Sequence, residues 1–348
     1  MEERTSLFAE RVRNFCLRLP KNVANAEYLS QLIRAGSSPG ANYIEANESI
    51  GDKDFKMKIK TCRRESKESS YWLRLVITDG SKEMDSLLSD KNHFHLWWLG
   101  QSGYLLQWKG ERVLIDPYLS NSLTKKYAAT DKPHTRMSER VMDPELLKNI
   151  SIVTSSHNHT DHLDAETLIP VLKNNPGVKF IIPEANREFV AERVKCKKEF
   201  PIGLNEGLSV TVDEFIFSGM PAKHNEIERD ENGNCKFMGY VIEFGNYKIY
   251  HSGDTIWFDE MVDLLKPFAV DVAILPINGN DPSRKVAGNL NCQEAAKLGK
   301  LIGAKLVIPC HYDMFTFNTA NISDFTKEAE KLDQPYQVLK GGERFSSN

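Results

Sequence analysis

The densest group of residues that could do chemistry lies at residues 155–164, which read SSHNHTDHLD and hold three of the chain's nine histidines. The run follows a strand-like stretch and precedes a helix-like one, and functional groups are commonly held on such loops. In an extended loop alternate side chains point the same way, so His157 and His159 can bind one ion together. Asp161 and His162 then turn toward a second point nearby. Imidazole and carboxylate suit zinc, manganese or iron. A catalytic base in polar surroundings and a solvated His-rich loop are the alternatives, because short motifs often match by chance.

Three later segments supply the same residue types: PAKHNE contains His224, IYHSGDT contains Asp254 and VIPCHYD contains His311. Together with HNHTDH they resemble the metallo-β-lactamase superfamily, in which these elements follow in this order. The resemblance implies an α/β fold, the αβ/βα sandwich of that superfamily. It also implies a hydrolase with two divalent transition-metal ions, or with one ion as the alternative. The implied ligands are His157, His159 and His224 for one metal, and Asp161, His162 and His311 for the other, with Asp254 bridging them.

By the same resemblance, two neighbouring cations lower the pKa of a shared water, so that a metal-bound hydroxide exists near neutral pH. Asp161 is then the catalytic residue that orients this hydroxide. The cations polarise the carbonyl or phosphoryl oxygen of the substrate and stabilise the charge that develops there. The five histidines bind a metal only when they are neutral, so we expect activity to collapse in acid.

Three residues near these motifs have expected roles other than metal binding. Asp116, in LIDPY, resembles an acid that supports the metal-binding loop in this superfamily. His251 either supports the ligands or hydrogen-bonds to backbone at the end of a strand. Cys310, next to His311, is expected to be a buried and inert thiol, because no activating neighbour is evident.

The catalytic region is most similar to the L-ascorbate-6-phosphate lactonase group, through WWLGQSGYLL, HNHTDHLD, YHSGDT and AKLGKLIGAKLVIPCHYDMF, spread over about residues 94–316. The similarity implies opening of a lactone ring, on a sugar acid or phosphorylated sugar acid, and so a small-molecule anionic substrate. The segments around PAKHNEIERD and NGNDPSRKVAGN are where substrate contacts would lie. Candidates for binding the anion are Lys223, Asn278, Asn280, Arg284 and Tyr312. An ordinary polar loop position is the equally weighted interpretation for each of them.

Two other functions stay open. The same two-metal chemistry serves phosphodiester hydrolysis, as in the nuclease branch of the superfamily, because fold and site do not fix the substrate. A basic run between Lys53 and Arg64 gives this idea some support, although such a run is usually a solvated helix face. The third hypothesis is an oligomeric RNA-binding scaffold that carries the hydrolase domain as a passenger.

The pattern of the chain changes near residue 90, which predicts two domains, 1–90 and 91–348. After residue 90, short β runs alternate with helices. They include FHLWWLG, YLLQW, RVLIDPY, SIVTSS, VKFIIP, DVAILPI and KLVIPCH. Gly245-Asn246 predicts a hairpin turn within GYVIEFGNYKIYHSG. A helix is expected to begin at Asn291, with Glu294 as its capping partner.

Residues 1–90 are predicted to be all-α, a three- to four-helix bundle. An apolar stripe from Phe8 to Leu19 ends at Pro20, and further helical segments run from about 25 to 48 and from 52 to about 76. The glycines and proline of GSSPGANY (36–43) predict a break in the second segment. RVRNFCLRLPKN, QLIRAGSSPGANYIEANES and DFKMKIKTCRRESKESSYWLRL, however, resemble the four-helix-bundle proteins encoded in 23S rRNA intervening sequences. That resemblance implies one long helix through 36–43, a ring-like homo-oligomer and, in some relatives, nucleic-acid binding.

The composition excludes several classes of protein. Of the 348 residues, 41% are hydrophobic and 27% charged, which is ordinary for a globular protein, and the net charge of −3 argues against a generally basic nucleic-acid binder. No apolar run approaches 18 residues, so no membrane helix is expected, and the charged start MEERTSLFAERVRNF lacks the apolar core of a signal peptide. The six cysteines contain no CxxC pair. A cytoplasmic protein with free thiols is therefore expected.

Overall fold

The computed structural model describes the whole chain except residues 18–22, 76–79, 282–283, 285–287 and 348. The chain forms two compact units, Met1–Glu83 and Met84–Asn348. No helix in the described part of the chain is long and apolar enough to cross a membrane.

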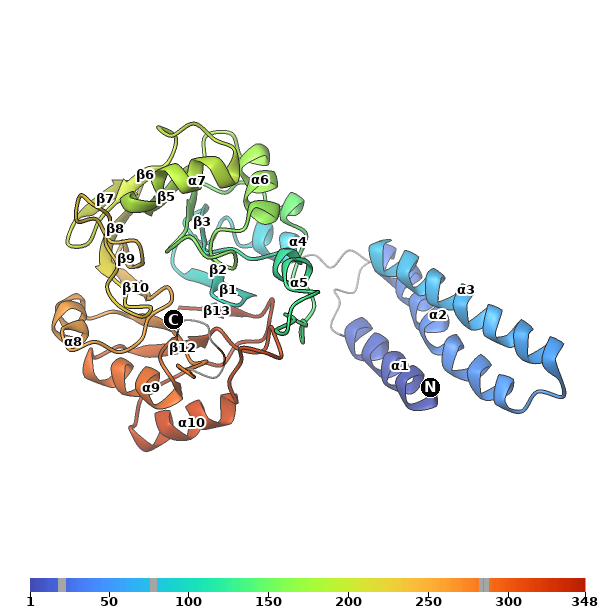
Figure 1. The fold of residues 1–348 in the computed structure, drawn as a ribbon. Helices are drawn as coiled ribbons and strands as arrows, with labels where there is room; N and C mark the ends of the chain where they lie inside the picture. Colours follow the sequence, from blue (N-terminus) through green and yellow to red (C-terminus); the bar gives the residue numbers. More distant parts are fainter. Residues whose placement is uncertain (18–22, 76–79, 282–283, 285–287, 348) are drawn as a thin grey trace. The chain divides into compact units, whose positions relative to one another are not determined.

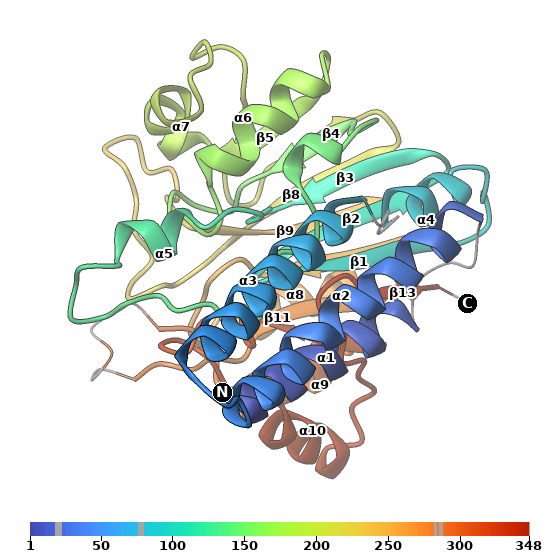
Figure 2. The ribbon, with the colours of Figure 1, turned by 90° about the vertical axis from the view of Figure 1, so that its right-hand side faces the viewer.

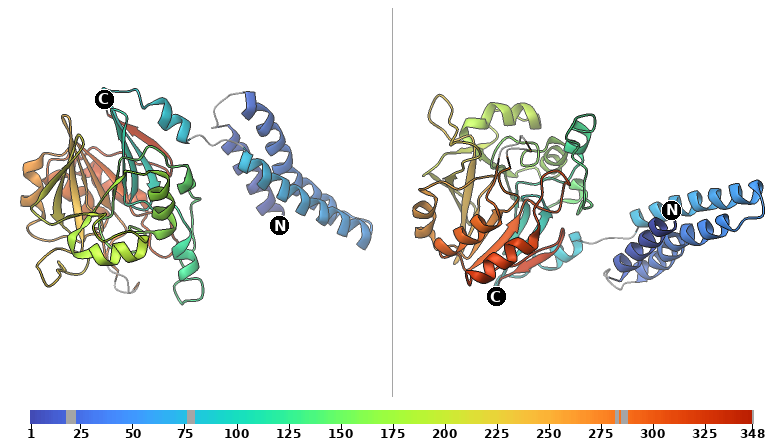
Figure 3. Two further views of the ribbon diagram at one scale, coloured as in Figure 1. Left: turned by 90° about the horizontal axis from the view of Figure 1, so that it is seen from above. Right: turned by 60° about the horizontal axis from the view of Figure 1, so that its bottom comes forward.

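The first unit is helical. Its helices are α1 (Glu2–Cys16), α2 (Val23–Asn47), α3 (Asp52–Leu75) and the start of α4 (Gly80–Ser86). Figure 3 shows α1, α2 and α3 running alongside one another. Val12, Cys16 and Leu32 are buried where α1 and α2 meet, with Trp72 of α3 packed against them. The predicted helix ends at Pro20 and Val76 lie outside the described residues.

Helix α2 is continuous through residues 36–43, with Pro39 inside it. The break predicted from propensity is therefore wrong, and the long helix implied by the resemblance is confirmed. Packing explains the glycine at position 36: a Cβ there would lie 2.9 Å from Cγ1 of Val12 on α1, so only glycine allows this close approach of the two helices. At Gly40 a Cβ would meet Thr5 at an ordinary 3.5 Å.

This difference predicts opposite effects for two glycine substitutions in α2. Gly36→Leu should lower the free energy of unfolding of the helical unit by about 1–3 kcal/mol, because the stiff side chain of Val12 cannot move aside. Gly40→Ala should leave it unchanged or raise it by up to about 1 kcal/mol, since alanine is the better helix former. Chemical denaturation followed by circular dichroism measures both. Equal stability of the two variants would contradict the close contact at Gly36.

The second unit contains two β-sheets that face each other, with helices on their outer sides (Figure 1). The seven-stranded sheet has the order β13-β1-β2-β3-β4-β5-β6 and the six-stranded sheet the order β12-β11-β10-β9-β8-β7. The strands of the first sheet are β1 (Phe94–Gly100), β2 (Gly103–Trp108), β3 (Glu111–Ile115), β4 (Ile152–Thr154), β5 (Lys179–Pro183), β6 (Ile202–Leu204) and β13 (Arg344–Ser346). Those of the second are β7 (Ser209–Val212), β8 (Phe215–Pro221), β9 (Met238–Phe244), β10 (Tyr247–His251), β11 (Val272–Pro276) and β12 (Leu306–Cys310).

Helices cover the outer faces of both sheets. Figure 2 shows α6 and α7 beside β4 and β5. The α-helices of this unit are α5 (Ser122–Lys126), α6 (Ala165–Asn174), α7 (Arg187–Val194), α8 (Met261–Leu265), α9 (Cys292–Leu301) and α10 (Ile322–Lys331). Short 3₁₀ turns are η1 (Pro144–Leu146), η2 (Glu184–Asn186) and η3 (Lys266–Phe268). This is the predicted αβ/βα sandwich.

The sequence of β1 explains how its sheet becomes buried on both faces. Leu96 and Trp98 belong to the core between the two sheets, whereas Trp97 and Leu99 belong to the core beneath α6 and α7. Successive side chains of a strand point to opposite faces, so a continuous apolar run fits a strand that is covered on both sides.

Two local predictions in this unit are confirmed. Strands β9 and β10 form an antiparallel hairpin in which Phe244 pairs with Tyr247 around Gly245-Asn246, and Gly245 has a positive φ of 54°. Asn291 caps α9 through the amide of Glu294, and the Glu294 side chain accepts in return from the Asn291 amide.

Candidate metal centre

The seven predicted ligands come from the carboxyl ends of four strands in the two sheets. The run 157–162 follows β4, His224 follows β8, Asp254 follows β10 and His311 follows β12. Loops at the carboxyl ends of strands are the usual site of function in α/β folds. Residues far apart in the sequence therefore meet at one edge of the sandwich.

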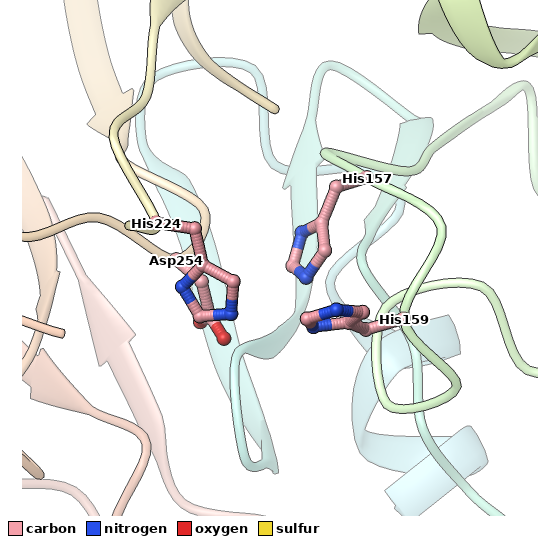
Figure 4. A group of neighbouring side chains, drawn as sticks. All are labelled: His157, His159, His224 and Asp254. Carbon is pink, nitrogen blue, oxygen red and sulfur yellow. The ribbon is translucent and has the colours of Figure 1, made fainter. Parts of the chain in front are cut away.

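These residues form two groups, and within each group the possible ligand atoms lie within 4.8 Å of one another. Asp254 belongs to both. Figure 4 shows one group, in which the three imidazoles and the Asp254 carboxylate point toward a common space. The first group is His157, His159, His224 and Asp254, and the second is Asp161, His162, Asp254 and His311.

Several of the atoms that face this space are buried without a hydrogen-bond partner among the described residues. They are Nε2 of His157, Nε2 of His162 and Oδ1 of Asp254, of which the last two lie 3.2 Å apart without the geometry of a hydrogen bond. Buried polar atoms are normally satisfied, and orphaned ones call for an explanation. Bound cations supply it, because imidazole nitrogen and carboxylate oxygen are donors that zinc, manganese and iron accept. The residues present fit two divalent ions that share Asp254.

The other ring nitrogen of three of these histidines is already occupied. Nδ1 of His162 lies 2.7 Å from Oδ2 of Asp116, and Nδ1 of His224 lies 3.0 Å from the carbonyl oxygen of Gly288. Nδ1 of His157 is 3.0 Å from the Ser156 hydroxyl. Such contacts fix the ring orientation and leave Nε2 for the metal.

Asp116 is fully buried one residue beyond β3, where its backbone adopts a positive φ of 42°. Besides contacting His162, it accepts hydrogen bonds from the Ser156 amide, at 2.9 Å, and from the Ser156 hydroxyl. It therefore fastens the start of the 157–162 loop to the end of β3. The structure places this carboxylate behind the ligands and not among them.

His251 and Cys310 lie beneath the site. Nε2 of His251 is 2.9 Å from the carbonyl oxygen of Ser102, so the ring hydrogen-bonds to backbone. Cys310 is buried with its sulfur 3.9 Å from the Ser102 hydroxyl, and burial raises the pKa of its thiol. A thiol with a raised pKa is a poor nucleophile.

The two groups differ in electrostatics. Burial lowers the pKa of His224 to about 4, so this ligand is neutral at pH 7. Burial also acts to lower the pKa of His311, but the Asp254 and Asp161 carboxylates outweigh it and raise that pKa to about 9. The pKa of His162 is likewise raised, because the same two carboxylates outweigh its burial. The second group therefore holds protons in the metal-free protein at neutral pH.

This asymmetry predicts that metal loading releases protons from the second group. Cations bind only neutral imidazole, so His162 and His311 must lose protons on binding at pH 7, and their affinity for metal should rise as the pH increases toward 9. Calorimetric titration with zinc in buffers of different ionisation enthalpy gives the number of protons released. Affinity that is independent of pH between 7 and 9 would contradict the prediction.

A cavity of about 430 Å³ opens beside the ligands. Its described lining includes His159, Asp161, His224, Asp254 and His311 together with Gln101, Leu123, Lys126, Tyr127, His134, Asn158, Thr160, Phe189, Arg193, Phe315 and Asn318. Cavities of this size hold small molecules.

The five predicted substrate contacts are set back from the metal cavity, although Asn278 and Arg284 donate to Oδ1 of its lining residue Asn318 at 2.9 Å and 3.0 Å. Asn278, Asn280 and Arg284 line a second pocket. The Tyr312 hydroxyl donates to the carbonyl of Leu339 at 2.9 Å and its ring stacks on Trp98. The Lys223 backbone amide donates to Thr255 Oγ1. The described lining of the metal cavity contains none of these five residues.

Gln101 is a site residue that sequence reasoning missed. It follows β1 with a positive φ of 51°, and its Nε2 donates to Oδ2 of Asp161 at 2.9 Å and lies 3.0 Å from Nε2 of His311. The only signal was its position in the tight connection GQSG between two strands.

Fold and ligand set together define the metallo-β-lactamase class of metal-dependent hydrolases. Residues 111–312 match the family model described as the Beta-lactamase superfamily domain. A UPF0173 metal-dependent hydrolase of Archaeoglobus fulgidus is 30% identical over 258 residues, which are 72% of this chain and 98% of the relative. One from Rubrobacter xylanophilus is 30% identical over 249 residues, 68% of this chain and 90% of the relative. The chain belongs to the metallo-β-lactamase superfamily and, within it, to the UPF0173 metal-dependent hydrolases.

Solved structures show the same fold. Igni18, a metallo hydrolase from Ignicoccus hospitalis, matches with a TM-score of 0.54 and 23% identity over 74% of this chain and 99% of its own. An isothiocyanate hydrolase from Delia radicum gut bacteria matches with a TM-score of 0.57 and 20% identity over 72% of this chain and 98% of its own.

Proposed function

We propose that this metal-dependent hydrolase opens the lactone ring of a sugar acid or of a phosphorylated sugar acid. The observation that carries the proposal is the pair of ligand groups that share Asp254, because five of their seven residues line a cavity of about 430 Å³. A cavity of this volume suits a monosaccharide-sized substrate better than a polymer. The similarity of the strand-end motifs to the ascorbate-phosphate lactonase group supports the choice of bond.

When bound, two divalent ions supply an acidified water and a Lewis acid for the ester carbonyl. Asp161 is the residue of this chain that is placed to orient the attacking water. Burial raises the pKa of Asp161, but nearby His162 and His311 outweigh this effect and keep the pKa low. The side chain is therefore an ionised carboxylate, which can accept a hydrogen bond from water. Gln101 holds it by the 2.9 Å hydrogen bond.

The overall reaction balances without another reactant. Water adds to the carbonyl carbon, the ring C–O bond breaks, and the departing alkoxide takes up a proton to give the hydroxy acid. Asp161→Asn should therefore lower kcat on the order of 10²-fold or more, measured with metal in excess, because it removes the charged acceptor. Since Asp161 also belongs to the second ligand group, the metal affinity of that group should fall as well.

A substrate panel tests the proposal on metal-loaded full-length protein. The panel contains aldonolactones with and without a 6-phosphate to test lactone opening, and bis(p-nitrophenyl) phosphate to test phosphodiester hydrolysis. It also contains benzyl isothiocyanate, because one protein of similar fold is an isothiocyanate hydrolase. We expect lactone opening, followed by acid release with a pH indicator. Hydrolysis of the phosphodiester alone would replace the proposal with the nuclease-type alternative.

We also propose that the helical unit mediates self-association. Its helices expose several large apolar side chains to solvent, and a second copy of the chain could cover some of them. They are Leu7, Ile33, Ile44, Phe55 and Met57. Light scattering of the full-length chain across a concentration series should show multiples of 39.6 kDa that Ile44→Glu or Phe55→Glu reduces. A monomer at all concentrations would end this proposal.

A further inference from the structure

Two positively charged side chains line the metal cavity without a carboxylate partner within ion-pair distance among the described residues. They are Lys126, the last residue of α5, and Arg193 on α7. Each has a neighbour on its own helix that is paired: Lys125 contacts Glu166 at 2.8 Å, and Arg187 contacts Glu184 at 2.7 Å. The two charged side chains that face the cavity, Lys126 and Arg193, are therefore available to bind a ligand.

Arg193 is held at one end only. Its NH1 nitrogen donates to the carbonyl oxygen of Asn158 at 2.6 Å, and its guanidinium lies 4.4 Å above the Phe189 ring. Asn158 stands between two metal ligands, so the guanidinium is fastened to the metal-binding loop itself. Among the described residues no hydrogen bond is found for its Nε and NH2 nitrogens, so these donors can bind a ligand, and a planar guanidinium suits a carboxylate or phosphate.

Lys126 is positioned by the loop that follows α5. The His134 ring stacks on Tyr127 with centroids 4.3 Å apart, and the His134 carbonyl accepts from the Thr124 hydroxyl at 2.7 Å. Nδ1 of His134 lies 3.1 Å from the carbonyl of Lys132, which fixes the ring against the backbone. The end of α5 is therefore set against the cavity, although the lysine itself is exposed.

We propose that Arg193 and Lys126 form an anion-binding site that holds a phosphate or carboxylate of the substrate while its reacting group lies at the metal ligands. The site rests on the proposed function, because a phosphorylated or carboxylated sugar-acid lactone carries such a group away from its ring ester. Arg193 supplies the directional, partly buried contact and Lys126 adds attraction at the exposed side.

The test uses metal-loaded full-length protein and four variants, with Asp254→Asn as a separate reference that should lack the metals. Arg193→Gln and Lys126→Ala remove the two cations. Arg187→Gln and Lys125→Ala are matched controls, since each removes a paired cation from the same helix. Thermal melting and metal stoichiometry establish that each variant is folded and loaded. Calorimetry then measures binding of glucose 6-phosphate, gluconate and glucose, and hydrolysis assays give the ratio of kcat/KM for a phosphorylated over a neutral aldonolactone.

We expect Arg193→Gln to lower the preference for the charged probe on the order of 10- to 100-fold, and Lys126→Ala on the order of threefold, with both controls like the wild type. Loss confined to glucose 6-phosphate identifies a phosphate site, and loss confined to gluconate a carboxylate site. Equal binding of all three probes by the wild type would overturn the site. So would anion binding that Asp254→Asn abolishes and Arg193→Gln leaves intact, because the anion would then lie on the metals. Anion binding that depends on Arg193 without turnover of any lactone supports the site and removes only the lactone assignment.

Discussion

Replacing Asp254 by asparagine should remove both metal ions and reduce hydrolysis on the order of 10³-fold or more, since its carboxylate is the only one shared by the two ligand groups in the described structure. The buried side chain keeps its shape in the variant, but an amide gives the cations no charge and bridges them poorly. Elemental analysis of protein purified without chelator should fall from about two ions per chain to fewer than one, the stoichiometry expected of a two-metal site.

Asp164→Asn is the matched control. Asp164 is also a buried aspartate beside the metal-binding loop, but its carboxylate accepts hydrogen bonds from Ser122 and Thr167 and belongs to neither ligand group. This variant should keep both ions. If Asp254→Asn retained two ions and wild-type turnover, the shared-carboxylate arrangement would be refuted.

The second large effect is expected at Asp116, which touches no metal position. Asp116→Asn puts an amide where a carboxylate now faces Nδ1 of His162, so the ring loses the partner that fixes its tautomer. Metal affinity of the second group should fall about 10- to 100-fold, the usual cost of losing such a partner. Asp116→Ala should in addition lower the free energy of unfolding of the metal-free protein by about 1–3 kcal/mol, because the buried His162 ring and the Ser156 amide lose a hydrogen-bond partner.

Zinc titration with a competing chelator distinguishes the two groups. The first group contains His157, whose Nδ1 contacts the Ser156 hydroxyl, and it should keep most of its affinity in Asp116→Asn. The isotherm of Asp116→Asn should therefore show one strong site and one weakened site. Equal weakening of both sites would show that Asp116 acts on the whole loop through Ser156.

The clustering of the candidate metal ligands could be predicted from the sequence, because each residue lies within a few residues of a strand end in a short motif. A motif of that kind fixes both the path of the backbone and the direction of the side chain. The order of His157, His224, Asp254 and His311 along the chain therefore indicated that they meet in the fold. The hairpin at Gly245 and the cap at Asn291 are equally local.

The cavity wall could not be predicted in the same way. Lys126 and His134 lie in the long connection between β3 and β4, where neither a period of 2 nor one of 3.6 marks which side chains face inward. Arg193 lies on a helix whose inward face depends on tertiary packing. In helix α2 a local pattern was present but misleading. The low helix propensity of Gly36 and Pro39 predicts a break, but packing against Val12 on another helix keeps the segment helical.

The origin of the ligands in both sheets has a thermodynamic consequence. The 157–162 loop belongs to one sheet and His224, Asp254 and His311 to the other, so each ion, with ligands from both sheets, would act as a crosslink across the sandwich. By mass action, free metal at about a thousand times its dissociation constant adds about 4 kcal/mol to the resistance of the fold to unfolding. The stability of the hydrolase unit therefore depends on the supply of metal. A shortage of that metal would shorten the lifetime of the folded protein and would also abolish its activity.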